Sequence, residues 1–78
     1  MRILDKQFHN KYKMIGLNIA YYRRLKNYTQ ENLAEKIDID QTHLSKIERA
    51  AVGVSLDLLF KIADVLDVDV YKFFVFKS

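Results

Sequence analysis

The chain has 78 residues with no cysteine, no proline and two glycines, and half of its residues are apolar. A chain of this length forms one domain, and the lack of cysteine excludes a disulfide framework and a thiolate zinc site. No apolar run approaches the ~20 residues that span a bilayer, so we expect a compact, all-α, cytoplasmic protein that needs no metal or cofactor.

Charge is distributed unevenly along the chain. Residues 1–30 hold seven basic residues and one acidic residue, residues 31–78 hold six basic and nine acidic residues, and the overall net charge is +3. This asymmetry indicates either one surface suited to a polyanion and another suited to a different partner, or ordinary solvated faces.

Residues 1–13 form a basic segment, MRILDKQFHNKYK, for which the sequence allows two structures. The apolar spacing allows one helix from about residue 5 to 26, but Gly16 in its interior would cost about 1 kcal/mol relative to alanine. We therefore favour an N-terminal arm or helix extension at 1–13, followed by a domain at 14–78 whose first helix spans about 14–26. The inner face of this helix is expected to hold Ile15, Ile19, Tyr22 and Leu25.

The stretch from Thr29 to Arg49, TQENLAEKIDIDQTHLSKIER, predicts two short helices joined by a tight turn. Thr29 and Asp40 are suitable N-caps, because their side-chain oxygens can accept hydrogen bonds from free backbone amides. The apolar stripes are Leu33, Ala34 and Ile37 in the first helix and Leu44 and Ile47 in the second. So short a connection makes the two helices cross at a steep angle, which defines a helix-turn-helix.

The rest of the chain predicts a loop at 50–54 and two further helices. Ser55 is the expected N-cap of the first, which we expect to be the packing centre because it is apolar on most sides, with Leu56, Leu59, Phe60, Ile62, Ala63 and Leu66. Asp67 ends this helix, and Asp69 can cap a short last helix at 70–74. The predicted fold is a compact five-helix orthogonal bundle.

From about Ile15 to Phe74 the chain resembles the Cro/C1-type (Xre-like) helix-turn-helix family, typified by the DNA-binding domains of lambdoid phage repressors. The matching elements are IGLNIAYYRR, TQENLAEKI, DQTHLSKIER and SLDLLFKIADVLDVDV, in this order and spacing. The resemblance implies a lambda-repressor-like fold and a sequence-specific transcriptional regulator of double-stranded DNA. In length the chain is similar to phage repressors and restriction-modification controller proteins, which implies a dimeric repressor or autoregulator at a two-fold symmetric operator.

The resemblance also implies roles for individual residues. Glutamine can pair with adenine and lysine with guanine, which suits the base-contacting positions, Gln41, Thr42, Ser45 and Lys46. The positions implied to contact the DNA backbone are Thr29, Gln30, His43 and Arg49, and Gln30 is also implied to support the recognition helix. Lys46 could equally contact a phosphate, and His43 could simply pack beside Tyr28. Arg23 and Glu48 match a partly buried ion pair whose members each require the other.

The chain departs from the family pattern where relatives often place glycine after a helix, at Asn27, Asp38, Ala50 and Asp67. Asparagine and aspartate tolerate the left-handed conformation that such helix ends require. Ala50 implies either strain or a different course of the following loop. That loop, AAVGV, carries no basic residue, so its electrostatic anchoring to DNA should be weaker.

The aromatic C-terminus is the expected homodimer interface, consisting of Val68, Val70, Tyr71, Phe74 and Phe76. The alternative is that rings such as Phe73 and Phe74 close the monomer core. No catalytic or metal-binding motif is present, so we expect no enzyme, and with no sensor domain attached we expect no small-molecule effector. The second functional hypothesis is an antitoxin or other protein-interaction module that binds a partner through its acidic C-terminal half.

Overall fold

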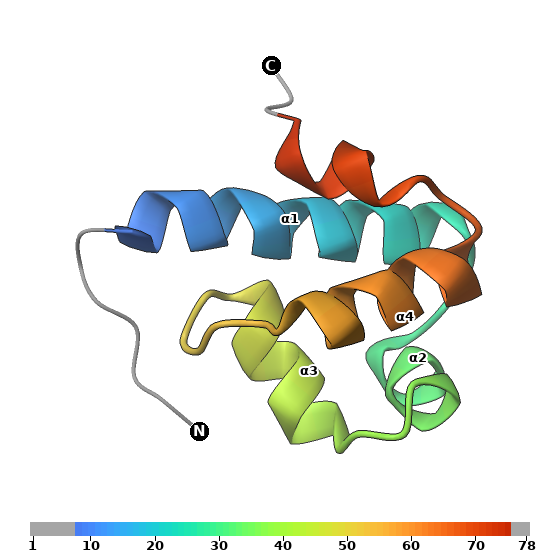
Figure 1. Cartoon of the computed structure of the whole chain (residues 1–78). Helices are drawn as coiled ribbons and strands as arrows, with labels where there is room; N and C mark the ends of the chain where they lie inside the picture. Colours follow the sequence, from blue (N-terminus) through green and yellow to red (C-terminus); the bar gives the residue numbers. More distant parts are fainter. Residues whose placement is uncertain (1–7, 76–78) are drawn as a thin grey trace.

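Four α-helices and one short 3-10 helix make up the described part of the chain, residues 8–75 of a computed structural model. They are α1 (His9–Leu25), α2 (Gln30–Lys36), α3 (Gln41–Glu48), α4 (Leu56–Leu66) and the 3-10 helix η2 (Val70–Phe74). In Figure 1, η2 lies along one side of α1, and α2, α3 and α4 lie on the other side. The all-α prediction is confirmed, with the correction that the last of the five helices is a 3-10 helix. None of these helices is both long and apolar enough to cross a bilayer.

Helix α1 begins at His9 and continues through Gly16, so the favoured start near residue 14 was wrong. Glycine occurs at this position because α1 and α3 come into close contact there, and not because the helix starts nearby. A Cβ atom on Gly16 would lie 2.7 Å from the carbonyl oxygen of Ile47 and would also clash with the carbonyl oxygen of Glu48. Gly16 is therefore the residue that lets α1 approach the end of α3. Of the arm or helix extension expected at 1–13, residues 1–7 lie outside the described residues and residues 9–13 belong to α1.

All four α-helices end in the same way, with a left-handed residue that is not glycine. The four residues have φ values between 54° and 66° and are the predicted ones, Asn27, Asp38, Ala50 and Asp67. After each of them, the next amide donates to a carbonyl five residues back, as from Ala51 to Lys46 at 2.8 Å. Ala50 keeps this conformation, so the chain has the strained helix end rather than a different loop course.

Two of the four expected N-caps form hydrogen bonds. The Thr29 hydroxyl accepts from the amide of Asn32 at 3.0 Å, and the Ser55 hydroxyl accepts from the amide of Leu58 at 3.1 Å. Asp40 and Asp69 do precede α3 and η2, but neither side chain makes a capping bond, which corrects the prediction. Both aspartates are exposed, so water competes for their carboxylates.

The core lies between α1, the helix-turn-helix and α4. Its fully buried side chains are Ile19, Leu33, Ile37, Leu44, Leu59, Ile62, Leu66 and Phe73. Helix α4 buries only one face, since Leu56 and Phe60 are 62% and 48% exposed, and Leu25 of α1 is also exposed. These three residues were wrongly assigned to buried faces. Of the two neighbouring rings near the C-terminus, Phe73 closes the core and Phe74 stays at the surface.

A buried asparagine on α1 attaches η2 to the rest of the molecule. Asn18 is 3% exposed, and its Nδ2 donates to the carbonyl oxygens of Phe73 and Val75, each at 2.9 Å. These bonds join residues at least 55 positions apart. Carbonyl groups at a helix end lack a partner within the helix, and Asn18 supplies one for two of them. These bonds hold the end of η2 against α1 and thereby fix where its exposed rings lie.

Candidate nucleic-acid interface

Helix α3 presents a continuous polar face on one side and anchors itself with the other. At 3.6 residues per turn, the face spans roughly 140° of the helix surface and holds the side chains of Gln41, Thr42, Ser45, Lys46 and Arg49. All five are exposed or partly exposed. On the opposite side Leu44 and Ile47 are 0% and 2% exposed. The four predicted base-contacting residues are thus brought together on one face, and Arg49 lies beside them.

Glu48 ties this helix to both α1 and α2. Its Oε2 atom lies 2.7 Å from Nε of Arg23, and its Oε1 atom accepts from the Arg23 NH2 group at 3.2 Å and from Nε2 of Gln30 at 2.9 Å. The third guanidinium nitrogen of Arg23 donates to the carbonyl oxygen of Tyr28 at 2.9 Å. The ion pair expected from the sequence is present, with side chains only 8% and 6% exposed.

This network sets the orientation of the polar face. A bidentate pair between guanidinium and carboxylate restricts distance and angle together. Because the carboxylate belongs to α3 and its partners belong to α1 and α2, the helix cannot rotate without breaking several of these bonds. Gln30 therefore supports α3 through Glu48, as the resemblance implied for this glutamine.

Two of the predicted backbone-contacting residues lie in different settings. Thr29 is exposed at the start of α2, and its hydroxyl oxygen already serves as the cap of that helix. His43 is half-buried and lies apart from the polar face, in a hollow that it lines with Glu35, Asp38 and Asp40. These carboxylates disfavour a phosphate contact by His43. The described residues contain no cluster of histidine and acidic side chains that could hold a metal ion.

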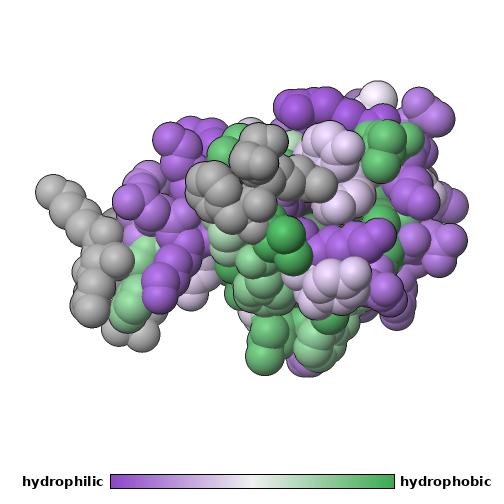
Figure 2. Space-filling view, turned by 90° about the horizontal axis from the view of Figure 1, so that it is seen from above, coloured by the Kyte–Doolittle hydropathy of each residue, from purple (hydrophilic) through white to green (hydrophobic). Residues whose placement is uncertain are grey.

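The predicted dimer residues divide into two groups. Val68 and Val70 are half-buried against the core, whereas Tyr71 and Phe74 are 59% and 46% exposed. Phe76 lies outside the described residues. Figure 2 views the molecule from the side on which η2 lies in Figure 1, and it shows apolar residues that reach the surface between hydrophilic ones.

Helix α1 adds exposed apolar residues that the sequence analysis missed. Leu17, Tyr21 and Leu25 are 58%, 45% and 57% exposed. Their spacing of four residues places them along one stripe of the helix, and this spacing was a signal that the sequence carried. They lie next to Asn18 around the helix, the residue to which η2 is bonded.

Helices α2 and α3 are joined by a short turn at residues 37–40 and pack against each other and against the rest of the domain, as the helices of a helix-turn-helix protein do (Figure 1). The helix-turn-helix family profile matches residues 19–73, and the chain belongs to this family. The resemblance to Cro/C1-type proteins is thereby confirmed.

The chain is similar to three particular proteins. It is 37% identical over 60 residues to an HTH-type transcriptional regulator of Methanocaldococcus jannaschii, with 77% of this chain and 91% of that protein covered. It is 42% identical over 59 residues to the transcriptional regulator SinR of Bacillus subtilis, with 74% of this chain but only 53% of SinR covered. A SinR structure in complex with DNA has a TM-score of 0.70 at 40% identity, covering 76% of this chain and 95% of that chain.

The third relative is the restriction-modification controller protein C.AhdI of Aeromonas hydrophila. Its crystal structure has a TM-score of 0.79 at 28% identity and covers 83% of this chain and 98% of that chain. All three relatives are regulators by name, and the prediction of a regulatory rather than enzymatic protein is confirmed.

Proposed function

We propose that this chain is a sequence-specific DNA-binding transcriptional regulator of the cytoplasm, which places α3 in the major groove and binds a two-fold symmetric operator as a homodimer. The observation that carries the proposal is the polar face of α3, which is continuous, solvent-exposed and held by a buried ion pair from behind. Side chains of these types pair with base edges in the major groove. The SinR structure bound to DNA supports the proposal, because its fold and sequence are similar to those of this chain.

In this proposal the four polar residues near the start and middle of α3 read base edges. Gln41 can pair with adenine through both its amide atoms, and Lys46 can donate to O6 and N7 of guanine. Thr42 and Ser45 lie beside them and supply a methyl group and hydroxyls. Each good base contact should contribute about 1–3 kcal/mol of discrimination against a wrong base.

Other residues would position the domain on the phosphate backbone. Arg49 is exposed at the end of the same face of α3. Gln30 is held by Glu48 at the start of α2, so its side chain needs little further ordering when DNA binds. Phosphate contacts of this kind fix the register of the protein and carry no sequence information themselves.

The dimer would place two copies of α3 in successive major grooves, roughly 34–36 Å apart. Tyr71 and Phe74, exposed on η2, are the proposed centre of the interface, with Val68 and Val70 beneath them. A pair of exposed rings on so small a protein favours association, since large apolar patches on monomers are uncommon. Operator occupancy would then depend on protein concentration.

The test is selection of random DNA duplexes by the purified chain at near-physiological salt, followed by sequencing of the retained duplexes. We expect an enriched two-fold symmetric site whose half-sites lie about one helical turn apart. Sedimentation with the selected site should give two chains per duplex. Weak, salt-sensitive binding without enrichment would contradict the proposal and favour the alternative of a protein-interaction module such as an antitoxin.

A further inference from the structure

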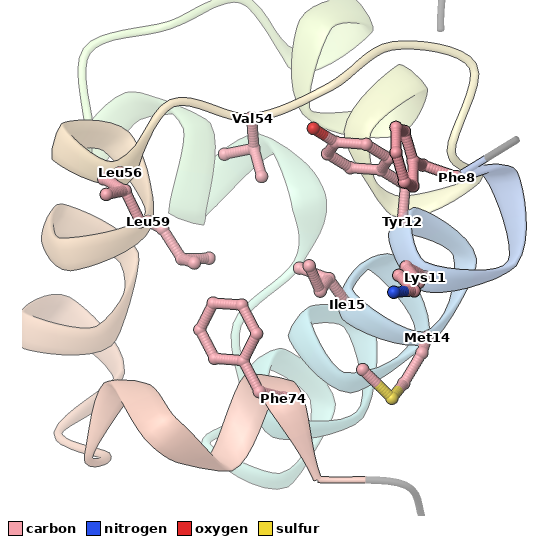
Figure 3. A pocket seen from close by; sticks show the side chains of 9 residues that line it. All are labelled: Phe8, Lys11, Tyr12, Met14, Ile15, Val54, Leu56, Leu59 and Phe74. Atoms are coloured by element: carbon pink, nitrogen blue, oxygen red, sulfur yellow. The ribbon is translucent and has the colours of Figure 1, made fainter. Parts of the chain in front are cut away.

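An apolar groove opens on the side of the molecule where α1, α4 and η2 come together. Its volume is about 410 Å³, and its lining comes from the start of α1, the loop before α4, α4 itself and η2. Ile15 and Leu59, which are 9% and 1% exposed, form its floor. Leu56 and Phe74 stand at its rim and are 62% and 46% exposed. Figure 3 shows Leu59 and Val54 facing Ile15 across the groove.

One charged group lines this groove among the described residues, the ammonium of Lys11. Its Nζ atom lies 5.8 Å from the centre of the Phe8 ring, which is itself part of the lining. A positive charge beside an apolar surface is the complement of a molecule with an apolar body and a negatively charged end.

We propose that this groove binds a small carboxylic acid with an apolar chain, such as a medium-chain fatty acid. The chain would pack against Ile15 and Leu59, and the carboxylate would lie at Lys11. This ligand site is separate from the polar face of α3 and goes beyond the proposed binding of DNA, although it shares Phe74 with the proposed dimer interface. It also departs from our expectation that no small molecule acts on the protein.

The size of the groove favours a small molecule over a second protein chain. Small-molecule sites measure roughly 300–1,000 Å³, and this groove falls in that range. A specific protein interface instead buries about 800 Å² on each partner, which needs a broad surface rather than one hollow.

The test is a titration of the full chain with octanoate and with hexanoate, without DNA, followed by NMR of the methyl groups. We expect saturable shifts at Ile15, Val54 and Leu59, and none at Leu33, which lies in α2. Octanoate should bind about 15-fold more tightly than hexanoate, because each buried methylene adds about fourfold. Shifts that do not saturate, or that spread evenly over the molecule, would overturn the proposal.

Matched variants test the site itself. Leu56→Glu places a carboxylate at the rim of the groove and should abolish octanoate binding. The control is Leu17→Glu, because Leu17 is also more than half exposed but does not line the groove. This control should leave octanoate binding unchanged. Both residues are exposed, so both variants should remain folded. Equal binding by the two variants would show that the ligand lies elsewhere.

The charged end is tested at Lys11. Lys11→Met should weaken octanoate by about two- to fivefold and leave the neutral analogue octanol unaffected. Lys13→Met, at an exposed lysine of the same helix that does not line the groove, is the control. Octanoate and octanol binding that respond equally to Lys11→Met would refute the assignment of a carboxylic acid. Because no DNA is present in these titrations, their result does not depend on the proposed binding of DNA.

Discussion

Replacing Gly16 by alanine tests the contact that positions α1 against α3. Helix propensity alone predicts that Gly16→Ala, in the middle of a 17-residue helix, stabilises the protein by about 1 kcal/mol. The structure predicts the opposite sign. The added Cβ would lie 2.7 Å from the carbonyl oxygen of Ile47 and 2.8 Å from the carbonyl carbon of Glu48. These are backbone atoms, so relief requires α3 or α1 to move as a whole.

The expected magnitude follows from the two opposing effects. Overpacking a well-packed contact costs about 1–3 kcal/mol, and a clash with backbone belongs at the upper end of this range. Subtracting the gain in helix propensity leaves a loss of about 2 kcal/mol in the free energy of unfolding. For a domain of this size, that loss should lower the melting temperature by about 8–16 °C.

Thermal unfolding followed by far-ultraviolet circular dichroism measures this change directly. Lys13→Ala is the control, because it also places alanine in α1 but at an exposed position, where the change should stay within about 0.5 kcal/mol. If Gly16→Ala were as stable as the parent chain, or more stable, the close approach of α1 to the end of α3 would be wrong.

Substitutions at three further places, the end of α3, the buried ion pair and the polar face of α3, have expected outcomes. Ala50→Gly should raise the free energy of unfolding by about 1 kcal/mol in urea titrations, because glycine adopts the left-handed conformation without strain; a loss would contradict the positive φ. Arg23→Met should lower it by about 3–5 kcal/mol, because the buried Glu48 carboxylate would lose its cationic partner. The double variant with Glu48→Leu should be more stable than Arg23→Met alone. Lys46→Ala should lose about 1–3 kcal/mol of binding free energy on the selected DNA site only. Arg49→Ala should weaken the binding of specific and random duplexes alike. Equal losses on both kinds of duplex for Lys46→Ala would make Lys46 a phosphate contact.

The parts of the fold that could be predicted from the sequence depend on short-range interactions. The caps at Thr29 and Ser55 join residues three positions apart, and the left-handed helix ends are set within a single turn. The polar face of α3 follows from residue spacing alone, since a helix of known start distributes its side chains in a fixed order. All of these features can be predicted from short stretches of the sequence.

The features that could not be predicted join residues far apart in the sequence. Gly16 was taken as a reason against a helix that starts near residue 5, because its partners, the last carbonyls of α3, are more than 30 residues away. Asn18 carried no signal at all, because its acceptors are backbone carbonyls 55 and 57 residues further along. A local pattern shows that a polar residue falls on an inward face, but not which distant backbone group satisfies it.

The contact of Gly16 with the end of α3, which local reasoning missed, also helps to position the candidate DNA-binding face. The carbonyls that Gly16 approaches belong to Ile47 and Glu48, and the Glu48 carboxylate is the group bonded to Arg23 and Gln30. The end of α3 is therefore held both through its backbone and through its side chain. A substitution that disturbs either contact should shift the polar residues of α3 together, because they share one rigid helix. Loss of stability and loss of DNA specificity should accordingly coincide at Gly16 and Glu48, whereas at Lys46 specificity should change while stability stays the same.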